Sequence, residues 1–131
     1  LTFQDGRVVG VEAETGRDVL KKLVETDDGA ARLGEVALVP HSSPISKFGK
    51  LFYNTLFDEN ASNHVALGQA YNVCVEDGEN MAEADFAEAG GNTSVTHVDF
   101  MIGSEEMDID GVMADGSTEA VMRQGEWAFE A

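Results

Sequence analysis

The chain of 131 residues is long enough for one domain with a hydrophobic core. Its 25 Asp and Glu outnumber eight Lys and Arg, which gives a formal net charge of -17 at pH 7. Such a negative field repels phosphate groups, so we expect neither nucleic acid nor an anionic membrane surface as a partner. No apolar run approaches the ~20 residues that span a bilayer. The single cysteine, Cys74, excludes an internal disulfide and favours a reducing, cytoplasmic location.

The acidic excess has two interpretations. Most of the carboxylates are expected to form a solvated surface that keeps the protein soluble in salt. A few of them would instead bind metal ions, which requires suitable spacing and histidines nearby. The three histidines of the sequence are His41, His64 and His97.

The first thirty residues predict a hairpin followed by a helix. Within residues 2–12, Asp5-Gly6 separates two β-prone segments, and this dipeptide is typical of a hairpin turn because both positions accept a positive φ. From Arg17 to about Thr26, apolar residues recur at the spacing of a helix with one buried face. That buried face is expected to consist of Val19, Leu20, Leu23 and Val24.

The middle of the chain predicts a strand, a loop and a second helix. Residues 35–39 are apolar after the first and are followed by a proline, which predicts a buried strand. Residues 41–46 are expected to form a loop, and the apolar residues 51–57 fit either a strand or a helix. A helix is expected over residues 60–71, with Ala and Val among its buried positions.

The last part of the chain is acidic and glycine-rich at first, then rich in β-type patterns. Residues 81–88 are expected to form one or two helical turns, and residues 94–102 alternate as a strand. Two further short strands are expected at residues 107–110 and 118–122, separated by Asp-Gly turns. The pattern as a whole predicts an α+β fold, with a mixed, largely antiparallel sheet and a few short helices.

His97 and Asp99 form the first candidate site. Residues two apart on a strand point to the same face, so both side chains are expected to project together while Val98 points away. A His-x-Asp pair places a nitrogen and an oxygen where they can bind one cation. The same spacing also fits a histidine that is hydrogen-bonded to an aspartate at a sheet edge.

Three other residues are candidates for the site, and two of them also have a purely structural interpretation. Glu35 opens an apolar strand, where a buried carboxylate must be paired, protonated or metal-bound, although Glu35 can also lie in water at the strand end. His64 and Tyr71 are seven residues apart, which places them on one face of the helix expected at 60–71. The alternative for His64 is a structural histidine near a helix start.

Long runs of the sequence resemble a known family. Residues 34–40, 51–62 and 96–104, together with the tail segments 107–111 and 125–128, resemble the C-terminal catalytic region of the aminopeptidase T, aminopeptidase S and PepS family. The resemblance extends over essentially the whole chain, with the runs in order. It implies part of a larger metallopeptidase catalytic domain that uses two divalent ions, reported as zinc, cobalt or magnesium. It also implies the release of N-terminal residues from peptides and a homodimer.

The resemblance also implies roles for particular residues. Tyr71 matches a tyrosine at the family's active site, and Asn63 stands where we expect a cysteine, next to a ligand but not itself one. Two imidazoles and two carboxylates form a mixed donor set suited to zinc, cobalt or manganese. In a two-metal hydrolase the ions share an activated water, and a nearby tyrosine hydroxyl stabilises the oxyanion. The residues that match metal ligands are Glu35, His64, His97 and Asp99.

One part of the family's site is expected to be missing. The family uses a further glutamate in an upstream segment that the sequence from Leu1 does not contain. We therefore expect residues 1–131 to be the C-terminal, metal-binding part of an aminopeptidase catalytic domain, inactive or nearly so in isolation. Two alternatives remain open: a non-catalytic domain that folds and dimerises without metal, and an acidic module that binds basic peptides.

Overall fold

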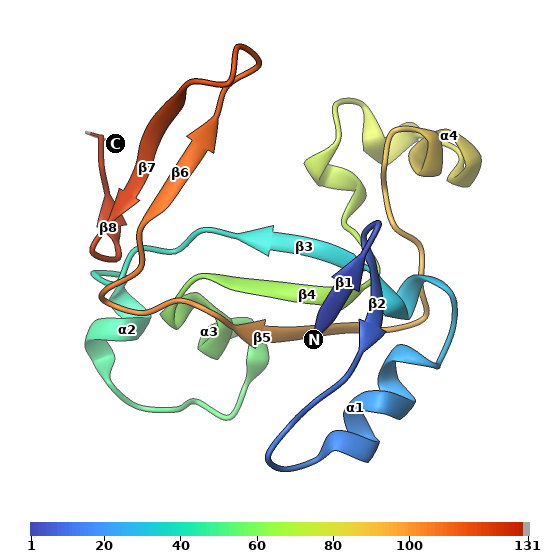
Figure 1. Cartoon of the computed structure of the whole chain (residues 1–131), viewed down its shortest axis with the longest axis horizontal. Coiled ribbons are helices and arrows are strands. Elements are labelled where there is room, and N and C mark those ends of the chain that lie inside the picture. The colour runs from blue at the N-terminus through green and yellow to red at the C-terminus, as the bar shows by residue number, and fades with distance from the viewer. Residues whose placement is uncertain (130–131) are drawn as a thin grey trace. The chain divides into compact units, whose positions relative to one another are not determined.

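The computed structural model describes residues 1–129, which form short helices and small sheets (Figure 1). The predicted α+β class is therefore confirmed. The chain forms two compact units. The first consists of Leu1–Val36 and Val65–Asp99, and the second of Ala37–His64 and the chain from Phe100 onward.

The first unit begins with the predicted hairpin, drawn in dark blue in Figure 1. Strands β1 (Thr2–Gln4) and β2 (Arg7–Gly10) pair antiparallel. The turn residues Asp5 and Gly6 have φ of 50° and 73°. Both values lie in the left-handed region that an Asp-Gly hairpin turn requires, so the hairpin prediction is confirmed.

Helix α1 (Arg17–Val24) follows, two residues shorter than predicted. Val24 is buried and Leu20 is half-buried, but Val19 is 73% exposed. The prediction that Val19 belongs to the buried face was wrong. At 3.6 residues per turn, Val19 lies about 140° around the helix axis from Val24, so one narrow buried stripe cannot contain both.

The chain also contains a three-stranded sheet, in the order β3-β4-β5. Its strands are β3 (Leu33–Ala37), β4 (His64–Gly68) and β5 (His97–Met101). Strand β3 begins two residues before the predicted strand, and Val36 within it is 66% exposed, so the expectation of a buried strand was wrong there. Every residue of the central strand β4 is buried.

The helix predicted over residues 60–71 was wrong, because this region contains β4. A short run such as Val65–Leu67 has no polar alternation, and apolar runs of this length do not distinguish a helix from a strand buried on both faces. This segment forms a strand because it lies at the centre of the sheet, between β3 and β5. The argument that His64 and Tyr71 share a helix face fails with it.

Short elements complete the first unit. Helix α4 (Glu83–Glu88) lies in the acidic segment, where one or two helical turns were predicted, and its Phe86 is buried. Single 3₁₀ turns occur at Gly29–Ala31, Asn72–Cys74 and Gly78–Asn80. The buried apolar residues of this unit are Val24, Ala30, Ala31, Val65, Ala66, Leu67 and Phe86.

The second unit begins with two short helices, α2 (Pro44–Phe48) and α3 (Thr55–Asp58). The loop predicted at residues 41–46 was wrong from Pro44 on, because the Ser43 hydroxyl caps a helix by accepting a hydrogen bond from the Ser46 amide at 3.1 Å. The apolar residues 51–57 end in α3, and a 3₁₀ turn follows at Glu59–Ala61.

An antiparallel sheet closes the second unit. Strand β6 (Ile109–Val112) pairs with β7 (Thr118–Arg123), which pairs with β8 (Glu126–Trp127). The two strands predicted here are confirmed to within two residues, while β8 was not predicted. Met122 of β7 is fully buried and contributes to this unit's core.

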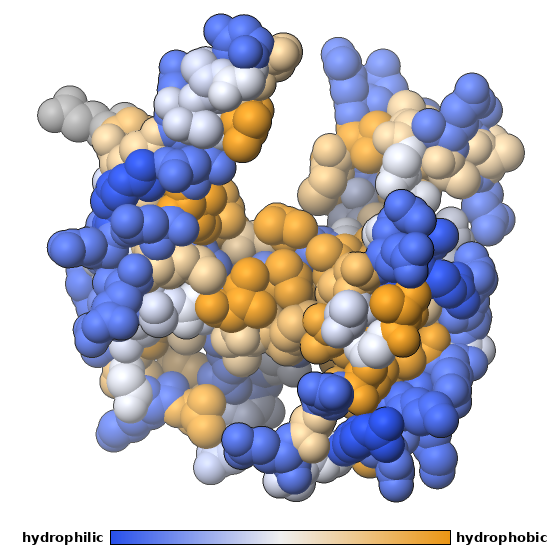
Figure 2. Space-filling model, viewed as in Figure 1, coloured by the Kyte–Doolittle hydropathy of each residue, from blue (hydrophilic) through white to orange (hydrophobic). Residues whose placement is uncertain are grey.

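Hydrophobic side chains are also exposed on the surface, among many hydrophilic ones (Figure 2). In the second unit the rings of Phe48, Phe52 and Phe57 stack on one another although each is more than one third exposed. Within residues 1–129, no helix combines the length and apolar character needed to cross a membrane.

Candidate metal centre

Strand β5 places His97 and Asp99 on the same face. The Nε2 atom of His97 lies 3.3 Å from Oδ1 of Asp99, which confirms the predicted alternation. The Asp99 side chain is only 6% exposed and that of His97 18%. A carboxylate this deeply buried must be compensated by a positive charge or by hydrogen bonds.

Glu35 approaches the same imidazole from β3. Its Oε2 atom lies 3.4 Å from Nε2 of His97, and its side chain is 24% exposed. Glu35 therefore lies in the middle of a strand and beside a histidine, and the alternative of a solvated residue at a strand end is wrong. Two carboxylates thus converge on one nitrogen of His97.

The other nitrogen of His97 is fixed by the backbone. Nδ1 lies 2.6 Å from the carbonyl oxygen of Gln69, and a carbonyl can only accept a hydrogen bond. Nδ1 must therefore carry a proton that it donates to Gln69. In the neutral ring, Nε2 is then the atom with the lone pair, which is the arrangement typical of histidines that bind metals.

The donor atoms of this arrangement suit a cation at its centre. The Nε2 lone pair faces Glu35 and Asp99, whose carboxylates are also acceptors. Oδ1 of Asp99 has no hydrogen-bond partner among the residues that the structure describes. A divalent ion fits the donor set, because it neutralises two carboxylates and accepts the histidine lone pair.

His64 opens strand β4 with a similar orientation. Its side chain is buried, and Nδ1 lies 3.0 Å from the carbonyl oxygen of Ser62, which leaves the lone pair on Nε2. The potential ligand atoms of Glu35, His64 and Asp99 lie within 4.8 Å of one another. The structure thus contains a possible metal-binding triad, with His97 beside two of its three members.

Tyr71 also lies beside this cluster, although not for the predicted reason. It directly precedes the 3₁₀ turn Asn72–Cys74, beyond the end of β4. Its ring centroid is 4.8 Å from that of His97, with the planes inclined by 47°. Because Tyr71 is 48% exposed, its face can contact both the imidazole and a molecule that arrives from solvent.

Two backbone carbonyls of the site carry no sequence signal. The carbonyls of Ser62 and Gln69 orient the two histidines, but every residue has a carbonyl, so their roles depend only on the fold. The third histidine, His41, is in the second unit, where its Nε2 lies 3.7 Å from Glu105 and its side chain is half-exposed. It resembles an ordinary surface ion pair rather than a ligand.

Comparison with known proteins places this chain in a family. The sequence matches the family described as thermophilic metalloprotease (M29) over residues 1–127. Aminopeptidase AmpS of Bacillus subtilis is 59% identical over 129 residues, which are 98% of this chain and 32% of AmpS. Aminopeptidase T of Thermus thermophilus is 55% identical over 125 residues, 95% of this chain and 30% of that protein.

A solved structure gives the same result. Wild-type AmpT from Thermus thermophilus matches the fold with a TM-score of 0.86 and 54% sequence identity, covering 97% of this chain and 31% of AmpT. The chain spans about a third of the length of the curated relatives that it matches. The resemblance inferred from the sequence runs is confirmed, and the chain belongs to the thermophilic metalloprotease (M29) family.

Proposed function

We propose that this chain is the metal-binding part of a metal-dependent aminopeptidase, an enzyme that hydrolyses N-terminal residues from peptides. One observation carries the proposal. His97 donates Nδ1–H to a carbonyl and turns Nε2 toward two carboxylates. One of them, Asp99, has a buried oxygen with no hydrogen-bond partner among the described residues. Membership of a metalloprotease family, and relatives named as aminopeptidases, support the reaction class.

The proposed ligands belong to a centre of two divalent ions, for which zinc, cobalt and magnesium are the candidates. When bound, such ions would polarise the scissile carbonyl and lower the pKa of a coordinated water. The chain's own contribution is to hold two imidazoles in one tautomer and to place carboxylates beside them. The proposed ligands are Glu35, His64, His97 and Asp99.

Tyr71 is proposed as the residue that contacts the reacting carbonyl. Its ring lies against His97, and half of it is exposed, so its hydroxyl belongs to a side chain that is both anchored and accessible. A phenolic hydroxyl can donate a hydrogen bond to the oxyanion that forms as the peptide bond is attacked. The many carboxylates of the chain would attract the cationic amino terminus of a peptide.

We also propose that the active enzyme is longer than this chain. The chain covers about a third of its relatives, and several large hydrophobic residues are exposed, among them Val36 of β3 and Val98 of β5. Exposed apolar surface of this kind is typical of surfaces that another segment or subunit covers. A further glutamate from an upstream segment would complete the metal site, and the active form would be a cytoplasmic homodimer. Residues 1–131 alone should be inactive or nearly so.

Calorimetric titration with Zn²⁺ or Co²⁺ tests the metal site. We expect stoichiometric heat from the wild-type chain, and its loss in Glu35→Ala, His97→Ala and Asp99→Ala. The matched control is His41→Ala, which removes an imidazole that lies beside Glu105 in the second unit. Equal binding by His97→Ala and His41→Ala would contradict the proposal.

The activity requires a separate test. A longer enzyme that contains this chain should hydrolyse aminoacyl p-nitroanilides, and chelation should abolish this activity. Activity that survives both EDTA and the double variant His97→Ala, Asp99→Ala would rule out the proposed reaction. A wild-type chain that folds and dimerises but binds no metal would instead favour the non-catalytic alternative.

A further inference from the structure

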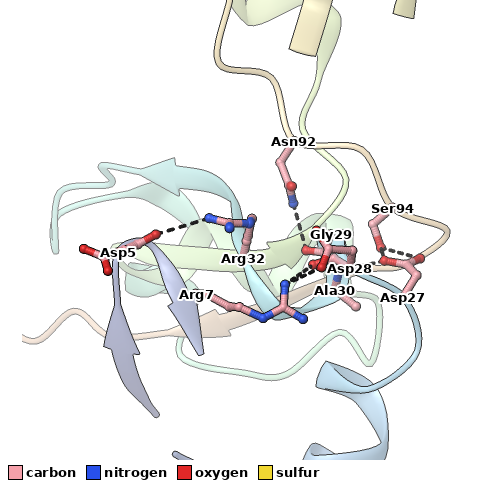
Figure 3. A network of polar contacts seen from close by, with 9 residues as sticks. All are labelled: Asp5, Arg7, Asp27, Asp28, Gly29, Ala30, Arg32, Asn92 and Ser94. Atoms are coloured by element: carbon pink, nitrogen blue, oxygen red, sulfur yellow. Dashed lines mark hydrogen bonds and ion pairs between the residues drawn. The ribbon is translucent and has the colours of Figure 1, made fainter. Parts of the chain in front are cut away.

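A carboxylate outside the proposed metal site is the origin of a hydrogen-bond path toward it. Asp27, just beyond α1, accepts hydrogen bonds from the amide of Ala30 at 2.8 Å and the hydroxyl of Ser94 at 2.9 and 3.0 Å (Figure 3). It also accepts from the amide of Val95 at 2.8 Å. These bonds, that from the Val95 amide above all, lower the pKa of Asp27, which is therefore ionised at neutral pH.

The path continues from Ser94 to Gln69. The Ser94 amide donates to Oε1 of Gln69 at 2.9 Å, and the Gln69 amide donates to the carbonyl of Thr96 at 2.7 Å. The Gln69 carbonyl accepts from Nδ1 of His97 at 2.6 Å. Gln69 is thus held through its side chain, its amide and its carbonyl by residues 94–97.

The backbone segments around this path are closely packed. Asn92 donates from Nδ2 to the carbonyls of Gly68 at 2.6 Å and Gly29 at 2.8 Å, and Figure 3 shows the contact with Gly29. A Cβ on Gly29 would lie 1.9 Å from the carbonyl oxygen of Thr93, and one on Gly68 would lie 2.1 Å from that of Thr96. Such close approach means that a shift of residues 92–96 displaces the end of β4 as well.

We propose that Asp27 is a positioning residue of the metal site. Through Ser94 and Val95 it fixes the segment that leads into β5, and that segment fixes the Gln69 carbonyl at which His97 is anchored. Asp27 therefore helps to keep His97 in the Nδ1–H tautomer, with Nε2 directed toward Glu35 and Asp99. This inference rests on the proposed function in one respect, that His97 is a metal ligand.

Three variants of the whole chain test the inference: two that each remove a hydrogen-bonding group of the path, and one control at a neighbouring residue. Asp27→Ala removes the acceptor, and Ser94→Ala removes only the hydroxyl, a milder change that serves if the first variant does not fold. Asp28→Ala is the control. Asp28 adjoins Asp27 and carries the same charge, but it pairs with Arg7, as Figure 3 shows, and makes no hydrogen bond to Ser94 among the described residues.

The first measurement is ¹⁵N NMR of the His97 imidazole in the metal-free chain. We expect a single Nδ1–H form in the wild type and in Asp28→Ala, and mixed tautomers in Asp27→Ala and Ser94→Ala. A role in stability alone would not change the tautomer of the molecules that remain folded. The second measurement is Co²⁺ affinity by calorimetry, which should fall about ten-fold or more in the two removals, as is typical when groups behind a metal ligand are lost.

A conservative variant at the same position provides a further test. Asp27→Asn retains one oxygen acceptor and should give an affinity and a tautomer ratio between those of the wild type and Asp27→Ala. Wild-type tautomer and affinity in Asp27→Ala, or in Ser94→Ala if Asp27→Ala does not fold, would overturn the inference. A wild type that binds no Co²⁺ would overturn the proposed function instead, while the NMR comparison would still decide whether Asp27 positions His97.

Discussion

The glycine that precedes Glu35 is expected to be indispensable for the geometry of the site. Gly34 lies in β3, and a Cβ added to it would lie 2.2 Å from the carbonyl oxygen of Gly68 and 2.5 Å from that of Gln69. The second of these oxygens is the acceptor for Nδ1 of His97. The substitution Gly34→Ala therefore presses one methyl group directly against the atom that orients a proposed ligand.

The size of the effect follows from these contacts. Ordinary contact begins at 3.4 Å, so the Gln69 oxygen must move by about 1 Å and the Gly68 oxygen by slightly more. Both atoms belong to the backbone, which cannot swing aside as a side-chain end can. Overpacking of this kind costs about 1–3 kcal/mol, and loss of the bond to His97 adds about 1 kcal/mol. We expect the free energy of unfolding to fall by about 2–4 kcal/mol.

Urea denaturation measures the stability, and calorimetry measures Co²⁺ affinity in the same samples. Gly111→Ala in β6 is the matched control, because its Cβ would meet the end of the Val121 side chain at 3.3 Å and the Glu119 carbonyl oxygen at an ordinary 3.8 Å. Gly34→Ala should lose stability and at least ten-fold in affinity, while Gly111→Ala changes both little. If Gly34→Ala were as stable as the control and bound Co²⁺ normally, the close approach of β3 to Gln69 would be refuted.

Three further predictions concern stability. Leu67→Ala, in the fully buried centre of β4, should lower the free energy of unfolding by about 2–5 kcal/mol in urea denaturation, whereas Val36→Ala, 66% exposed, should stay within about 0.5 kcal/mol of wild type. Asn63→Ala should cost about 1–3 kcal/mol in the same assay, because the Val39 amide loses its acceptor at 2.6 Å, and equal stability of variant and wild type would contradict this role. The pKa of Asp27 is lowered below its ordinary 3.8, so its contribution to stability is complete above pH 3.8 and is lost as the pH falls from there through the folded-state value. Asp27→Asn should accordingly show a shallower loss of stability than wild type when unfolding is measured from about pH 5 to pH 2, and parallel curves would argue against the bonded carboxylate.

Local patterns determined the elements that depend on neighbours in the chain. The hairpin turn needs two residues that accept a positive φ, and Asp5 and Gly6 both do. The turn therefore depends on these two residues and not on the packing around the hairpin. The alternation that places His97 and Asp99 on one face follows from the geometry of any strand. The family and the fold class could also be inferred, because long runs of residues carry them.

Elements without such local signals were predicted incorrectly. Residues 65–67 are all apolar, and only the place of β4 at the centre of the sheet makes this segment a strand instead of a helix. Tyr71 was assigned to the site through a shared helix face that does not exist, yet its ring lies against His97 because the chain turns beyond β4. A correct residue was thus reached through a wrong local structure.

By itself, then, the sequence determined which side chains could bind a metal, since residue type and strand period are local properties. Only the tertiary structure decided how they are oriented. The tautomer of His97 depends on the Gln69 carbonyl. That carbonyl keeps its position because Gly34, which has no Cβ, leaves room for it, and because a hydrogen-bond path from Asp27 fixes the neighbouring segment. These groups come from distant parts of the chain and meet at a backbone carbonyl, which every residue has and which therefore leaves no mark in the sequence.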